Sequence, residues 1–93
     1  MLVGVCTVEL RLPQATCLKD KRRVLKSIRD RVRSRYNVSI AEVDRQDNHK
    51  FAVLAMAMVS NETVPIHRTF GDIVRSLGAY AEAEVVFHRV EIY

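Results

Sequence analysis

Nine of the fifteen Lys and Arg residues fall within residues 18–36, and this concentration of charge is the sequence feature most suggestive of chemistry. Two Asp residues oppose them, so the segment carries a net charge of +7, whereas the rest of the chain carries −3. Cationic side chains neutralise phosphates and release condensed counterions, which supplies the sequence-independent part of nucleic-acid affinity. The segment therefore indicates a class of partner rather than a reaction.

Two stripes of residues follow the period of an α-helix within this segment. Apolar residues recur in steps of three and four, so they share one helical face. A set of basic residues recurs in the same steps, roughly 125° around the helix. Lys21 and Arg35 fall nearer the apolar side, where their charges must reach water or find partners. The apolar stripe consists of Val24, Leu25, Ile28, Val32 and Tyr36. The basic stripe consists of Lys19, Arg22, Lys26, Arg29 and Arg33.

The basic stripe has two interpretations. Most runs of charge are solvated helix faces that keep a protein in solution, and alternating signs would favour that interpretation. Here only Asp20 and Asp30 interrupt the positive charge. We therefore expect the basic stripe to bind nucleic-acid backbone.

Composition limits the architecture and the classes of function. Residues 1–93 are expected to form one domain, and the 48% hydrophobic content argues against disorder. Cys6 and Cys17 do not form a CxxC motif, which argues against a disulfide framework, a redox motif or a metal site. The N-terminal residues lack the charged and apolar segments of a signal peptide or membrane span, so a cytoplasmic protein without a membrane partner is expected.

The hydrophobic pattern predicts the order strand, helix, strand, strand, helix, strand. Strands are expected at residues 2–12, 38–43, 51–59 and 83–93, with helices at 18–36 and from about Pro65 to Gly78. Two split βαβ units of this length predict a ferredoxin-like α+β sandwich, in which a four-stranded antiparallel sheet carries two helices on one face. The first and third strands should be central, because they are the most apolar.

Local signals predict the ends of these elements. Thr16 is the expected N-cap of the first helix and Asn37 its left-handed C-cap. Ser60, Asn61 or Thr63 is expected to cap the second helix. The facing of residues 38–43 is unresolved, because Ile40 and Glu42 share one parity, and either a bulge or an outward Ile40 would resolve the conflict. Residues 44–50 are polar and predict a hairpin loop.

The run LKDKRRVLKSI at residues 18–28 resembles the signature that opens the first helix of the YlxP-like family of small bacterial proteins. NVS at residues 37–39, Glu42–Val43 and Gln46–Asp47 match further family motifs at similar spacing, so the resemblance covers essentially the whole chain. Cys17 stands where the family usually has a helix-capping Ser. The resemblance implies a ferredoxin-like fold. It also favours a role near ribosomal RNA, because family members are often encoded beside translation-initiation and ribosome-maturation factors.

An enzymatic function is not expected. An acylphosphatase-like hydrolase on this fold would need a glycine-rich phosphate loop with an Arg, and an Asn to position water. After the first expected strand the chain has LPQATCLKDK, which contains no glycine. His49, His67 and His88 lack the spacing of metal ligands. We therefore expect no catalytic residues, no cofactor and no metal.

Two partner hypotheses remain open. The first is a non-catalytic RNA- or ribosome-associated protein that contacts backbone through the basic stripe, with Gln46 and Asp47 as candidate loop contacts. Gln46 and Asp47 are equally explained by turn chemistry. The alternative is a protein-interaction module that forms a homodimer through its open sheet face. Residues 51–59 are apolar on both faces, and an exposed apolar patch usually marks an interface.

Overall fold

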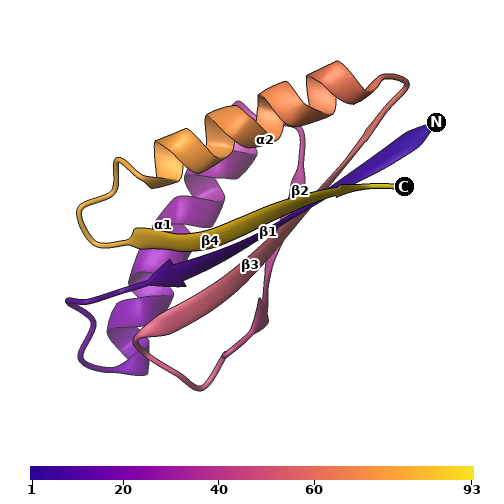
Figure 1. Ribbon diagram of the computed structural model, residues 1–93. Helices are drawn as coiled ribbons and strands as arrows, with labels where there is room; N and C mark the ends of the chain where they lie inside the picture. Colours follow the sequence, from indigo (N-terminus) through magenta and orange to yellow (C-terminus); the bar gives the residue numbers. More distant parts are fainter.

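The computed structural model describes residues 1–93 as a four-stranded sheet with two helices (Figure 1). The strands are β1 (Leu2–Arg11), β2 (Ser39–Asp44), β3 (Phe51–Ser60) and β4 (Glu84–Ile92). The helices are α1 (Leu18–Arg35) and α2 (Thr63–Leu77). The predicted order of elements and the ferredoxin-like α+β fold are confirmed.

The sheet is antiparallel throughout and has the strand order β2-β3-β1-β4. The two central strands pair along their whole length, from Leu2 opposite Ser60 to Arg11 opposite Phe51. The prediction that the first and third strands are central is therefore confirmed.

The core lies between the sheet and the helices. Alternate residues of β1 and β3 point toward the helices and are buried, which leaves the opposite parity on an outer sheet face that no helix covers. Burial raises the pKa of the Cys6 thiol to about 11, so this thiol is neutral at physiological pH. The helices contribute Val24, Leu25, Ile28 and Val32 from α1, and Ile66, Phe70, Ile73 and Leu77 from α2.

Gly4 of β1 allows α2 to lie close to the sheet. A Cβ atom at this position would stand 3.0 Å from Phe70 Cε2 and closer still to Ile66 Cγ2. A larger residue would force both side chains out of the packed core. The glycine in β1 is therefore explained by packing rather than by a turn.

The predicted caps of α1 are wrong. Cys17 occupies the N-cap position in an extended conformation and makes no side-chain capping bond. Thr16 is a donor rather than an acceptor, because its N–H and hydroxyl both donate to Asp20 Oδ2, at 3.0 and 2.8 Å. The carboxylate thus reaches back toward the chain before the helix, as the Glu of a capping box does. At the other end the C-cap is Tyr36, which is extended, and Asn37 does not adopt a positive φ.

The predicted N-cap of α2 is also wrong. Glu62 is the N-cap and forms no side-chain capping bond, while the Ser60 hydroxyl accepts a 3.2 Å bond from the Glu62 N–H. Pro65 lies in the first turn and Gly78 ends the helix, as predicted. Gly78 is right-handed, with φ −65°, so the helix ends without a left-handed residue.

The conflict between Ile40 and Glu42 is resolved by a partner for the carboxylate. Ile40 is buried at 3% exposure and faces the core. Glu42 faces the same side, because its Oε2 lies 2.7 Å from Lys21 Nζ. A register shift follows between Glu42 and Asp44, so the predicted bulge is present. Ile40 does not face outward.

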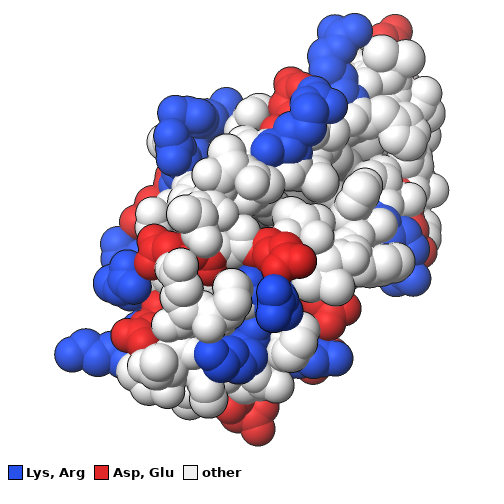
Figure 2. Space-filling view, turned by 60° about the vertical axis from the view of Figure 1, so that its left-hand side comes forward, with Lys and Arg blue, Asp and Glu red and all other residues white.

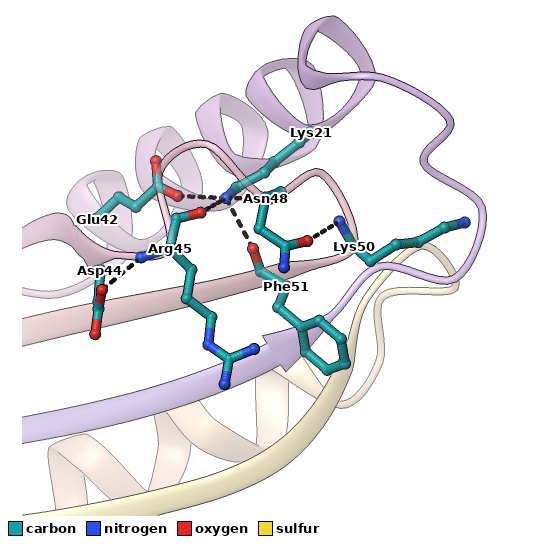
Figure 3. A network of polar contacts seen from close by, with 7 residues as sticks. All are labelled: Lys21, Glu42, Asp44, Arg45, Asn48, Lys50 and Phe51. Atoms are coloured by element: carbon teal, nitrogen blue, oxygen red, sulfur yellow. Dashed lines mark hydrogen bonds and ion pairs between the residues drawn. The ribbon is translucent and has the colours of Figure 1, made fainter.

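Lys21 is the one buried charged residue of the protein, at 1% exposure. Its Nζ donates to the carbonyl oxygens of Arg45 (2.6 Å), Asn48 (2.7 Å) and Phe51 (2.8 Å), as Figure 3 shows. An ammonium has three protons, so the carbonyls take all of them and Glu42 supplies the balancing negative charge. The loop between β2 and β3 is therefore folded around a side chain of α1.

Two further contacts shape this loop. Arg45 adopts a left-handed conformation, with φ 57°, and its N–H donates to Asp44 Oδ1 at 2.8 Å. The Asn48 side chain accepts a 2.9 Å bond from the Lys50 N–H (Figure 3). A left-handed residue other than glycine persists only where its surroundings hold it. The bond from Lys21 to the Arg45 carbonyl is one such restraint.

We expect Lys21→Met to lower the free energy of unfolding by about 3–5 kcal/mol, because it leaves a carboxylate and three carbonyls without their cation. Adding Glu42→Leu should recover part of this loss, since the unpaired charge is then removed. Urea denaturation of the single and double variants measures both effects. Lys26→Met, which breaks an exposed pair on the same helix, is the control and should change stability little. Equal losses for Lys21→Met and Lys26→Met would contradict this account.

Candidate nucleic-acid interface

The basic stripe lies on the solvent side of α1, as its spacing predicts. Lys19, Arg22, Lys26 and Arg33 are exposed, and Arg29 is half-buried. At a rise of 1.5 Å per residue the stripe extends about 21 Å along the helix. The helix over residues 18–35 places these five positions on one face, and their role in binding remains a prediction.

The five side chains differ in how far the fold already uses them. Lys26 Nζ lies 2.8 Å from Asp30 Oδ2, one turn along the helix. Arg33 Nη2 donates to the Ile40 carbonyl at 3.0 Å, which ties the end of α1 to β2. The other three form neither an ion pair nor a side-chain hydrogen bond. These three residues are Lys19, Arg22 and Arg29.

The two acidic residues of α1 are held in their charged form. Hydrogen bonds from the N–H and hydroxyl of Thr16 lower the pKa of Asp20. The hydrogen bond from Lys26 lowers the pKa of Asp30. Both carboxylates are therefore ionised at neutral pH. Asp30 offsets a charge of the basic stripe, whereas Asp20 is directed toward the start of the helix.

Acids from other elements neutralise part of the remaining positive charge of α1. Lys21 is paired with Glu42, and Arg23 Nη2 lies 3.1 Å from Glu82 Oε2. On the face drawn in Figure 2, Lys and Arg side chains are interspersed with Asp and Glu rather than gathered in one continuous area. The net charge of +7 counted along the segment therefore overstates the charge that α1 presents to a partner.

Gln46 and Asp47 lie exposed in the loop between β2 and β3, and their side chains form no hydrogen bond or ion pair in the structure. Because Lys21 holds this loop, it lies beside the N-terminal turns of α1 (Figure 3). The structure thus brings the two candidate loop residues to the end of the helix that carries Lys19 and Arg22. It does not place them against the C-terminal part of the basic stripe.

Sequence reasoning missed two basic residues on another flank of α1. Arg31 and Arg35 lie one turn apart and face the connection between α2 and β4, where Arg31 stands over the ring of Tyr80. Their spacing of four residues was a signal that they share a face. The position of Tyr80 could not be inferred from spacing, because Tyr80 comes from a distant segment of the sequence.

No group of three or more His, Cys, Asp or Glu side chains is placed to hold a metal ion. None of the three His residues takes part in a hydrogen bond or ion pair with another side chain. Neither helix of the structure is sufficiently long and apolar to cross a membrane.

Comparison with known proteins bears out the resemblance on which the sequence analysis drew. Residues 3–90 match the model of a family described as "Protein of unknown function (DUF503)". The chain is 31% identical over 90 residues to the uncharacterized protein YlxP of Bacillus subtilis (strain 168), covering 97% of this chain and 98% of that protein. The de novo designed protein Foldit4 has a similar fold, with a TM-score of 0.56 at 19% identity, covering 100% of this chain and 97% of the design. This chain is therefore a member of the DUF503 family.

Proposed function

We propose that the protein is a non-catalytic, cytoplasmic RNA-binding protein, which contacts the nucleic-acid backbone, free or in a ribosomal particle, through the basic stripe of α1. The observation that carries this proposal is the group of three cationic side chains without partners on one exposed helix face. They are Lys19, Arg22 and Arg29.

The remaining two residues of the basic stripe can join these contacts. Lys26 can exchange Asp30 for a phosphate, because exposed ion pairs contribute little stability. Arg33 donates one N–H to Ile40, and a guanidinium has five N–H donors, so others remain free for an acceptor. Steps of three and four residues place neighbouring cations about 5–6 Å apart.

Contacts of this kind read backbone and shape rather than sequence. RNA-recognition motifs on the same fold stack bases on aromatic side chains of the central strands. Here β1 has no aromatic residue and β3 has only Phe51, over whose ring the guanidinium of Arg45 lies at 5.0 Å. The sheet therefore supplies no comparable stacking platform, and binding through α1 is the better-supported mode. The gene neighbourhood of YlxP-like proteins favours RNA over DNA as the partner.

Binding to single-stranded RNA should weaken as salt rises. The slope of log affinity against log salt should lie between about −2, if three phosphates are contacted, and about −3.5, if all five residues contact one. Fluorescence anisotropy with unrelated RNA sequences over a salt series measures the slope, which should differ little between sequences. Binding that is absent or independent of salt would remove the basis of this proposal.

Changing Arg22 and Arg29 together to Ala should reduce the slope by about 1.4 and weaken binding to all sequences alike. The fold should survive, because neither residue belongs to the core. The same change at Arg68 and Arg75 of α2 removes equal charge and is the matched control. Equal weakening in both double variants would mean that overall charge, not the basic stripe, attracts RNA.

A second pair of variants raises the net positive charge, because each removes one carboxylate. Asp30→Asn frees Lys26 of its partner and should strengthen binding, with a slope steeper by up to about 0.7. Asp72→Asn frees Arg75 on α2 in the same way and is the control. Equal strengthening in the two variants would again point to overall charge.

A second candidate function rests on the outer sheet face. Exposed apolar side chains lie on this face or at its margins, and Val43, Val59 and Phe87 are 50%, 63% and 51% exposed. Ala55 stands at its centre, paired across the strands with Thr7 and Ala41. We infer that the occupant of this face is a second copy of the chain, which makes the protein a homodimeric interaction module.

The charges around this face support self-association. Six charged side chains form three pairs, each with one positive and one negative member, so these six side chains add no net charge to a contact between two copies. The nitrogen–oxygen separations are between 2.7 and 3.5 Å. The pairs are Arg11–Glu84, Arg45–Glu9 and Arg89–Glu91.

Light scattering at micromolar concentration should return twice the chain mass of 10.7 kDa. Ala55→Glu should yield monomers, because a two-fold interface brings equivalent or neighbouring positions of the two copies together. Val64→Glu introduces the same charge at an exposed valine of α2 and should leave the dimer intact. A monomeric wild-type protein would contradict the homodimer.

A further inference from the structure

Figure 1 shows α1 passing the C-terminal half of α2. A hollow of about 310 Å³ lies between residues of α1, the end of α2 and the connection to β4. By helical spacing, Arg31 and Arg35 project roughly 160–200° away from Arg33, so the hollow is not an extension of the basic stripe. It is lined by Arg31 and Arg35 of α1, Ser76 of α2, and Ala79, Tyr80 and Ala81 of the connection to β4.

The charge of the hollow is uncompensated. Neither Arg31 nor Arg35 forms an ion pair or a hydrogen bond through its side chain, and no Asp or Glu lines the hollow. The guanidinium carbon of Arg31 lies 5.6 Å from the centroid of the Tyr80 ring. This contact orients the guanidinium without using its N–H donors, which stay free for a ligand.

The Tyr80 hydroxyl is a further polar group of this region without a partner in the protein. It is buried and has no hydrogen-bond partner. A buried hydroxyl without a partner destabilises the fold, and native structures contain few such groups. Because the hydroxyl is buried, a ligand in the hollow can reach it only after the Tyr80 side chain turns toward the hollow. The Ser76 hydroxyl is not comparable, because it already donates to the Ile73 carbonyl at 2.7 Å.

We propose that this hollow binds a phosphate group, with Arg31 and Arg35 neutralising its charge and the Tyr80 hydroxyl, once turned toward the hollow, as a third donor. The planar donors of Arg match phosphate oxygens in pairs, and two guanidinium groups balance a dianion. The volume is at the lower end of small-molecule sites, which suits a small phosphate ligand or one unit of a longer chain.

Two sources of this phosphate share the same chemistry. It can belong to a free phosphomonoester such as a nucleotide, or it can be a phosphodiester of an RNA chain. In the second case the inference rests on the proposed function, because the RNA must also reach the basic stripe on another side of α1.

The test is a binding titration followed by calorimetry and by amide chemical shifts. The probes are inorganic phosphate, a nucleoside 5′-monophosphate and single-stranded RNA, the first two at up to millimolar concentration. The double variant Arg31→Gln with Arg35→Gln should weaken binding of at least one probe by about tenfold or more, as expected for lost hydrogen bonds to a charged group. Arg22→Gln with Arg29→Gln removes equal charge from the basic stripe. In this control, binding of the two small probes should be unchanged.

The pattern of losses identifies the source. Loss of monophosphate binding in the Arg31 and Arg35 variant alone assigns a free phosphomonoester, and this result stands even if the protein binds no RNA. Binding of RNA only, weakened more by the Arg31 and Arg35 variant than by the Arg22 and Arg29 variant, assigns a backbone phosphate. The inference is overturned if no probe binds, or if the two double variants weaken every probe equally. It is also overturned if the Arg31 and Arg35 variant lowers the melting temperature without changing affinity. The arginines would then serve only the C-terminal carbonyls of the helices.

Tyr80→Phe tests the third donor by itself. In the absence of phosphate its melting temperature should equal or exceed that of the wild type, because the change removes an unpartnered buried hydroxyl. The rise in melting temperature on adding the bound probe should be smaller than in the wild type. A lower melting temperature without phosphate, or an unchanged rise with it, would remove the hydroxyl from the site.

Discussion

The ammonium of Lys21 holds the helical layer to the β2–β3 hairpin, and the arrangement of that end of the molecule depends on it. Removing an ammonium from water is unfavourable by several kcal/mol, so a buried lysine is tolerated only where its charge and all of its protons find partners. Glu42 meets the first requirement, and the carbonyls of Arg45 and Asn48 in the loop and of Phe51 in β3 meet the second. The Arg45 carbonyl also accepts a 3.0 Å bond from the Asn48 N–H, so the bond from Lys21 adds to a turn that the loop already forms. The buried lysine therefore requires the loop, and the lysine holds the loop against α1.

This use of Lys21 shows how the fold divides the positive charge of α1. Lys21 forms a buried ion pair with Glu42, and Arg23 is paired with Glu82 of the connection before β4. What remains free is not one basic helix but two separate groups of cations on different flanks. One flank faces solvent along the length of α1, and the other faces the C-terminal end of α2. A count of charge along the chain does not distinguish the cations that are paired within the protein from those on the solvent flank or on the flank beside α2.

The fold could be predicted from sequence because its determinants are local. Strand alternation and helical period identify the six elements, and the two-sided apolar pattern of residues 51–59 places that strand centrally. The helix caps could not be predicted, because the Thr16 hydroxyl can donate or accept, the Asp20 carboxylate can accept from several groups, and only the packed chain selects one arrangement. Glu42 and Tyr80 were unpredictable for a stronger reason. Their partners, Lys21 and Arg31, lie far away in the sequence, and a pattern in one segment carries no information about the other.

The basic stripe and the outer sheet face lie on different sides of the molecule, so the two proposals for them are compatible. Both helices cover the inner face of the sheet, and a second copy docked on the outer face would leave each α1 exposed. Two basic stripes on one particle could then hold two segments of the same RNA. The second contact would form at a high effective concentration, so a dimer would bind long RNA more tightly than short RNA although each stripe makes the same contacts. Weak, sequence-tolerant contacts of a single helix could in this way support stable association with a large folded RNA.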